Sequence, residues 1–128
     1  IIEMVRCHYP DPLPTAGLLK RFGIADLEHR QAGGLSSGQQ RRLGVALAFA
    51  GNPGAVFLDE PTTGLDVEAR RALWQAIQEY AREGGTVLLT THHMEEAETL
   101  ATRVVFINQG RVVAAGPVEA IKARVGLK

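Results

Sequence analysis

Two adjacent acidic residues end a short apolar run, an arrangement that could bind a cation and activate water. Ala55–Leu58 is followed directly by Asp59 and Glu60. Neighbouring side chains of a strand point to opposite sides, so the two carboxylates could act separately. One could hold Mg²⁺ through water while the other polarises an attacking water. Taken alone, the pair is equally compatible with two acids that merely cap the following turn.

A turn of small residues, Leu35–Gln39, precedes a helical pattern. Backbone N–H groups and the positive end of the helix dipole at such a turn could bind an anion, although an ordinary serine N-cap is the simpler interpretation of this segment alone. Gly33 and Gly38 have the spacing of a phosphate-binding P-loop. However, Gln39 and Gln40 stand in place of its Lys and Ser/Thr, and no strand precedes Gly33, so the P-loop interpretation is rejected.

Two further polar residues lie at element boundaries. Asp66 precedes a long helical pattern and is expected to be its N-cap. His92 follows an apolar strand pattern, Thr86–Thr91, and α/β sheets bind ligands at the carboxyl ends of their strands. The alternative is that His92 only caps the next helix. His93 and Glu95 lie close by in sequence, but no further Cys or His cluster supports a zinc site.

Alternation of strands and helices from residue 55 onward predicts an α/β fold with a mostly parallel sheet. The run Ala55–Leu58 is expected to be buried on both faces, with Phe57 and Trp74 in the core. A short helix ending at Gly23 is expected near the N-terminus. The other expected elements are helices at Gln39–Ala50, Val67–Arg82 and Met94–Ala101, strands at Thr86–Thr91 and Val104–Ile107, a hairpin strand at Arg111–Ala115, and a helix after Pro117.

Composition indicates a globular chain without a strong electrostatic signature. Of 128 residues, 45% are apolar and 22% charged, and 14 Lys and Arg balance 14 Asp and Glu. This balance gives no electrostatic footprint for nucleic acid or an anionic membrane. No apolar run approaches the ~20 residues that span a bilayer. Because the chain starts at Ile1 rather than Met, a processed chain or an excised fragment is expected.

Taken together, the order of these segments resembles the ATP-binding-cassette (ABC) ATPases. Leu35–Arg42 resembles their signature motif, Val56–Pro61 their Walker B strand, Thr62–Asp66 their D-loop, and Thr90–His92 their switch-histidine segment. The resemblance implies a partial P-loop NTPase core with part of the ABC helical subdomain. Its P-loop strand, Walker A motif, adenine-stacking aromatic and Q-loop would precede Ile1. Residues 1–51 would belong to the helical subdomain, and residues 52–128 to the later half of the ATPase core.

The resemblance also implies a role for each matching residue. Asp59 would hold Mg²⁺ through water, Glu60 would be the general base, and His92 would contact the γ-phosphate of ATP. Asp66 would cross the interface of a head-to-tail dimer. The residues that would bind the γ-phosphate of an ATP seated on the partner subunit are Ser36, Ser37, Gly38 and Gln39. Ser37 stands where the motif usually has glycine, which matters if that position needs a positive φ.

Two C-terminal segments resemble the ATPase subunits of ABC-2-type drug exporters. These are His93–Glu98 and Gly110–Pro117. The implied partners are a second ATP-binding subunit and a transmembrane permease at the cytoplasmic face of the cell membrane, with no nucleic acid. The alternative is a non-catalytic interaction or dimerisation module. Intact Asp59, Glu60 and His92 argue against it, because such a module need not keep the acid, the base and the switch together.

Overall fold

The computed structural model describes residues 1–125. The chain forms two compact units, and the boundary along the sequence falls between Thr90 and Thr91. The first unit contains four α-helices, two 3₁₀ turns and two strands. In chain order these are α1 (Ile2–Arg6), α2 (Thr15–Arg21), η1 (Ala25–Leu27), η2 (Ala32–Gly34), α3 (Ser37–Phe49), β1 (Ala55–Asp59), α4 (Val67–Arg82) and β2 (Thr86–Thr90).

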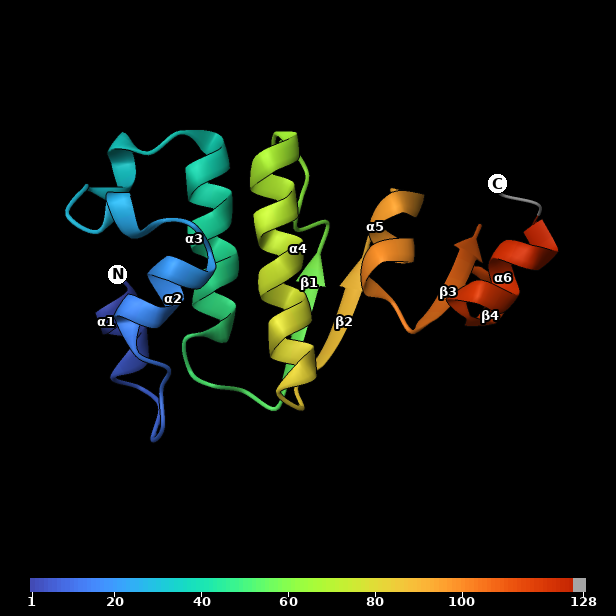
Figure 1. The fold of residues 1–128 in the computed structure, drawn as a ribbon, viewed down its shortest axis with the longest axis horizontal. Coiled ribbons are helices and arrows are strands. Elements are labelled where there is room, and N and C mark those ends of the chain that lie inside the picture. The colour runs from blue at the N-terminus through green and yellow to red at the C-terminus, as the bar shows by residue number, and fades with distance from the viewer. Residues whose placement is uncertain (126–128) are drawn as a thin grey trace. The chain divides into compact units, whose positions relative to one another are not determined.

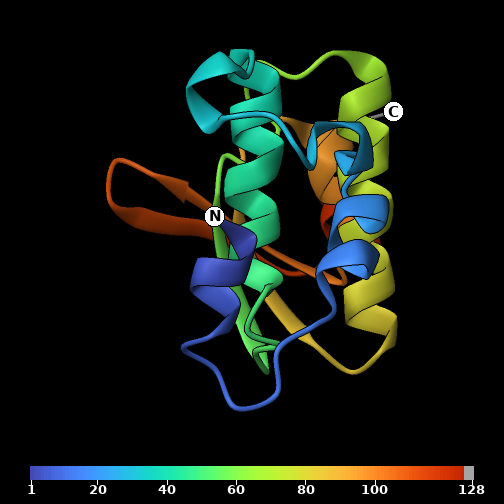
Figure 2. The same ribbon diagram turned by 90° about the vertical axis from the view of Figure 1, so that its left-hand side faces the viewer.

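The sheet of the first unit is a parallel pair joined by a helical crossover. β1 and β2 run in register from Ala55 opposite Thr86 to Asp59 opposite Thr90. A parallel pair requires such a crossover, and α4 supplies it. α3 contacts β1 and α4 contacts β2, and both helices lie on one side of the pair (Figures 1 and 2). The predicted crossover between two parallel strands is therefore confirmed.

Aromatic side chains fill the space between the helices of this unit. Phe49 of α3 lies with its ring centroid 5.2 Å from Phe22 and 4.9 Å from Tyr80 of α4. The Tyr80 hydroxyl donates a hydrogen bond of 2.6 Å to the carbonyl of Pro53. Burial raises the pKa of this hydroxyl. Trp74 is 7% exposed, which confirms its expected place in the core.

One face of the parallel pair is open, which contradicts the expectation that β1 is buried on both faces. Val56 and Leu58 are 4% and 6% exposed, but Phe57 is 74% exposed. Its register partner Leu88 is 61% exposed. The expectation that Phe57 belongs to the core is wrong, because α3 and α4 cover one face and no element within residues 1–90 covers the other.

The second unit begins with α5 (Met94–Leu100) and continues as a hairpin followed by a helix. β3 (Arg103–Asn108) and β4 (Arg111–Pro117) pair antiparallel, with a register shift between Phe106 and Ile107. Gln109 and Gly110 both adopt positive φ, 49° and 73°, at the tight turn. α6 (Val118–Val125) packs on this hairpin. The α/β class, the hairpin and the final helix are confirmed, and the described strands form one parallel and one antiparallel pair.

The open face predicts self-association of the 128-residue chain, because exposed apolar strand faces and unpaired strand edges favour contacts between molecules. Replacing Phe57 and Leu88 together by threonine should shift the sedimentation profile towards the monomer while preserving β propensity. Met4→Thr is the matched control, since Met4 is 70% exposed but lies on a helix. A monomeric profile for the unaltered chain across the concentration range would contradict the prediction.

Candidate functional site

Ser36 is the N-cap of α3 and forms a reciprocal capping box with Gln39. The backbone N–H of Gln39 donates to Ser36 Oγ at 3.2 Å, and the backbone N–H of Ser36 donates to Gln39 Oε1 at 2.9 Å. The helix begins at Ser37, earlier than the predicted Gln39. The two polar side chains of this turn therefore satisfy each other's backbone.

The same turn leaves two backbone donors free for an anion. The N–H groups of Ser37 and Gly38 belong to the first turn of α3 and have no acceptor among the described residues. They lie at the positive end of the helix dipole, which favours an anionic ligand. Ser37 has helical backbone geometry and is not among the residues with positive φ. Its Cβ therefore causes no strain at the position where the motif has glycine.

The turn after β1 packs against the start of α3. A Cβ added to Gly38 would meet Leu65 Cδ2 at 3.6 Å, an ordinary van der Waals distance, so the two segments lie within contact range of each other. The next residue, Asp66, is the N-cap of α4 and accepts a hydrogen bond of 2.7 Å from the N–H of Ala69. The predicted capping role of Asp66 is confirmed, and its role across a dimer interface stays a prediction.

Asp59 and Thr90 face each other at the carboxyl ends of the paired strands. They are register partners, and Thr90 Oγ1 donates a hydrogen bond to Asp59 Oδ1. The Asp59 side chain is exposed, so its carboxylate remains open to solvent. An exposed carboxylate beside a hydroxyl fits the preference of Mg²⁺ for oxygen ligands and retained waters.

Glu60 occupies a strained backbone position next to Asp59. Its φ is 49°, a left-handed conformation that costs a non-glycine residue roughly 1–2 kcal/mol. Its N–H donates to the Thr90 carbonyl at 3.1 Å and lies 3.3 Å from Thr90 Oγ1, while Glu60 Oε2 accepts from Thr63 Oγ1 at 3.4 Å. Strain of this kind persists only where the surroundings hold it, and it is common at functional sites.

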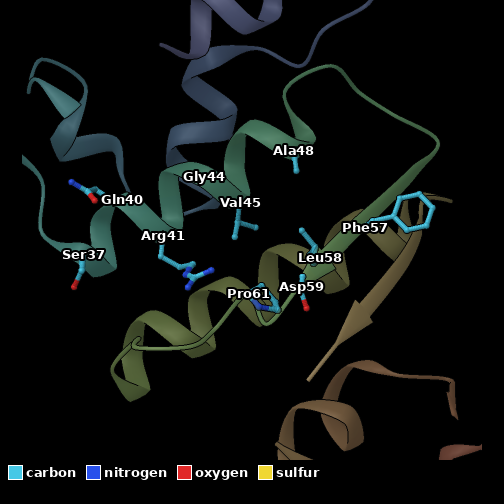
Figure 3. Close-up of a pocket in the computed structure, with 10 residues that line it drawn as sticks. All are labelled: Ser37, Gln40, Arg41, Gly44, Val45, Ala48, Phe57, Leu58, Asp59 and Pro61. Carbon is cyan, nitrogen blue, oxygen red and sulfur yellow. The ribbon is translucent and has the colours of Figure 1, made fainter. Parts of the chain in front are cut away.

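A pocket of ≈ 490 Å³ joins the start of α3 to the end of β1. Ser37 and Asp59, two of the predicted site residues, both line it. In Figure 3, Arg41 extends from α3 into this space, and Leu58 and Val45 point towards each other across it. Phe57 points away from α3 in the same view. The structure thus brings one residue of the predicted anion-binding turn, Ser37, and the predicted metal ligand, Asp59, to one hollow; Ser36, Gly38 and Gln39 do not line it.

His92 belongs to the second unit, where it is exposed and its ring contacts that of a neighbour at a tilt of 42°. Its ring centroid lies 4.0 Å from that of His93, which is the N-cap of α5. Within residues 1–125, no group of three or more His, Cys, Asp or Glu side chains could hold a metal ion.

The sequence interpretation did not give Thr90 a role of its own. The sequence feature that could have indicated Thr90 is its place as a polar residue at the carboxyl end of a strand.

Residues 19–98 match the family model described as "AAA domain, putative AbiEii toxin, Type IV TA system". The chain is 46% identical over 108 residues to ATP-binding cassette sub-family A member 7 of Mus musculus, covering 84% of this chain and 5% of that protein. It is 42% identical over 109 residues to daunorubicin resistance ATP-binding protein DrrA3 of Streptomyces coeruleorubidus, covering 85% of this chain and 34% of that protein. The chain therefore spans about a third of the bacterial relative's length, and far less of the mouse protein's.

Solved structures show the same fold. An ATP-binding subunit of an ABC transporter aligns with a TM-score of 0.81 at 28% identity, covering 98% of this chain and 55% of that one. An ATP-binding cassette of an ABC transporter in its ADP conformation aligns with a TM-score of 0.73 at 24% identity, covering 87% and 44%. Among the helices of residues 1–125, none combines the length and apolar character needed to cross a membrane.

The backbone angles predict opposite effects of glycine at two site positions. Ser37→Gly should lower the free energy of unfolding by up to about 1 kcal/mol, because it adds chain entropy without relieving a positive φ. Glu60→Gly should instead be more stable than Glu60→Gln, which keeps the left-handed strain. Urea titrations of the three variants measure both differences. A stabilising Ser37→Gly would contradict the helical geometry assigned to that residue.

Proposed function

The chain belongs to the AAA-domain family, among the ATP-binding proteins of ABC transporters, and we propose that it is part of a subunit that hydrolyses ATP to drive membrane transport. The observation that carries this proposal is the meeting of Asp59 and Glu60 with Thr90 at the end of the parallel pair. This arrangement supports two carboxylates with separate tasks at one strand end.

In the proposed mechanism, Asp59 would hold Mg²⁺ through water and Glu60 would polarise the attacking water. Mg²⁺ bound there would neutralise charge on the phosphate oxygens. Glu60 would accept a proton from the water as its oxygen bonds to the γ-phosphorus and the bond from that phosphorus to the β–γ bridging oxygen breaks, so that ADP and inorganic phosphate are released. The backbone hydrogen bond to Thr90 holds this glutamate in place. His92 would contact the γ-phosphate and couple hydrolysis to closure, as the resemblance implies.

The anion turn is proposed to act across a subunit interface. The N–H groups of Ser37 and Gly38 would donate to the γ-phosphate of an ATP seated on a second subunit, with Ser36, Gln39 and Asp66 completing the contact. This sequence contains no G-x-x-x-x-G-K-[ST] segment, so we assign the phosphate-binding loop to another part of the same ATPase. The 128-residue chain alone is then expected to be inactive.

We assign the complete protein to the cytoplasmic face of a membrane, in a head-to-tail dimer bound to a permease. Residues 1–51 would form part of the helical subdomain, and residues 52–128 the later half of the ATPase core. The similarity to daunorubicin resistance ATP-binding proteins supports an exporter of the ABC-2 type.

Glu60→Gln in the complete subunit should reduce ATP turnover by at least about a hundredfold while ATP stays bound, because an amide is a very poor proton acceptor. Steady-state turnover and nucleotide binding measure the two effects. Asp59→Asn is the informative comparison, since losing the carboxylate charge should instead raise the Mg²⁺ concentration needed for activity. A normal rate in Glu60→Gln would show that the general base lies elsewhere.

Ser36→Arg separates a capping role from a phosphate role. As a cap alone, the change should cost about 1 kcal/mol of stability and leave kinetics unaltered. As part of a clamp at the interface, it should spare ATP binding to the monomer but block ATP-driven dimerisation and turnover. Dimerisation is measured in the Glu60→Gln background, which traps ATP, and turnover with Glu60 intact. Normal dimerisation and a normal rate would leave only the capping role.

A further inference from the structure

We propose that Arg42 is a positioning residue. By bonding α3 to the C-terminal end of α2, it sets the orientation of the anion turn, residues 36–39, whose Ser37 and Gly38 N–H groups would bind phosphate. The inference rests on the proposed function of that turn. Arg42 lies in the second turn of α3, and its Nη1 donates a hydrogen bond of 2.9 Å to the carbonyl oxygen of Gly23. This bond joins the helix that carries the turn to a segment distant in sequence.

The acceptor belongs to a rigid helix ending. Gly23 adopts φ of 65°, and its N–H donates to the carbonyl of Lys20 at 3.2 Å. The next N–H, of Ile24, donates to the carbonyl of Leu19 at 2.8 Å, which completes a Schellman motif. Ile24 is 1% exposed and locks this ending into the core. The motif uses the carbonyls of Leu19 and Lys20, so the Gly23 carbonyl remains available to Arg42.

A second contact from the same ending fixes the orientation of α3. Phe22, adjacent to Gly23, packs its ring 5.2 Å from that of Phe49. Arg42 and Phe49 lie two turns apart on α3, about 10 Å at the rise of an α-helix. Two contacts at different levels, made by neighbouring residues, restrain both the axial position and the rotation of the helix. The N–H groups of Ser37 and Gly38 extend from that helix, so their direction follows from these contacts.

The environment of the Arg42 side chain indicates a role in orienting α3 rather than in stabilising the fold. Its side chain is half-buried, its Nε is buried with no hydrogen-bond partner among the described residues, and no ion pair within residues 1–125 involves it. Desolvating a charged group with incomplete pairing costs free energy, so an apolar side chain would connect α2 and α3 at a lower free-energy cost. A directional donor is what an apolar side chain lacks.

The test uses the complete ATPase subunit that carries this sequence. Arg42→Met should leave ATP affinity and binding stoichiometry unchanged within about twofold, but should lower turnover about tenfold and weaken ATP-driven dimerisation in the Glu60→Gln background by a similar factor. Arg42→Lys should recover part of the loss, because an ammonium can donate to the same carbonyl. Arg71→Met is the matched control, since it makes the same charge change at an exposed position of α4.

Gly23→Ala tests the same contact from the acceptor side. Its new Cβ would lie 3.4 Å from Arg42 Nη1 at a backbone φ that alanine disfavours, so it should displace the carbonyl and reproduce the loss of turnover. Combined with Arg42→Met, it should lose no more than the larger single effect, because both changes break one interaction. If Arg42→Met does not fold, Gly23→Ala decides the matter in the same assays.

The outcomes separate this inference from the proposed function. Wild-type turnover and dimerisation in Arg42→Met, with hydrolysis stopped in Glu60→Gln, would overturn the positioning role and leave the proposed function intact. Loss of ATP binding together with turnover in Arg42→Met would also overturn it, because that pattern marks a merely structural residue. Undiminished hydrolysis in Glu60→Gln would refute the proposed catalytic assignment alone, and the turnover of Arg42→Met would still test the positioning role.

Discussion

Parallel pairing of β1 with β2 is the interaction on which the candidate site depends. The register sets Asp59 opposite Thr90, so one threonine reaches both members of the acidic pair, through its hydroxyl to Asp59 and through its carbonyl to Glu60. The second of these bonds continues the ladder one residue beyond β1 while the chain turns with Glu60 at φ of 49°. A slip of the register by one residue would remove both contacts at once.

The N-terminus of α3 serves two competing demands. As a helix end it must satisfy orphan N–H groups, and Ser36 and Gln39 do so through their capping box. As a proposed phosphate site it must keep donors free, and Ser37 and Gly38 provide them. A phosphate that engaged the side chains of Ser36 and Gln39 would have to break the box, so ligand binding and helix capping draw on the same atoms. The backbone donors need no such exchange.

Apolar sequence alone did not distinguish a covered strand face from an open one. Phe57 and Trp74 have equally strong reasons to be buried, yet Trp74 is buried on α4 and Phe57 is exposed with its register partner Leu88. Alternation along β1 puts neighbours on opposite faces, and burial of both faces requires a second layer of structure. Such a layer depends on elements distant in sequence, whose presence a four-residue run cannot report.

Local chemistry in the sequence determined the caps of α3 and α4, the two strands with their crossover, the hairpin, and the order of the four motifs that resemble the family's. These depend on short-range rules, such as a serine or aspartate cap and a strand ended by charge, as at Ser36, Asp59 and Asp66. Tertiary structure decided what long-range contacts fix: the bonds of Thr90 to the acidic pair, the strained backbone of Glu60, and the link from Arg42 to Gly23. The polar residue at the end of β2 indicated a site but not its partners, and the other two features have no signature in residue type or spacing, because each depends on how distant segments meet in space.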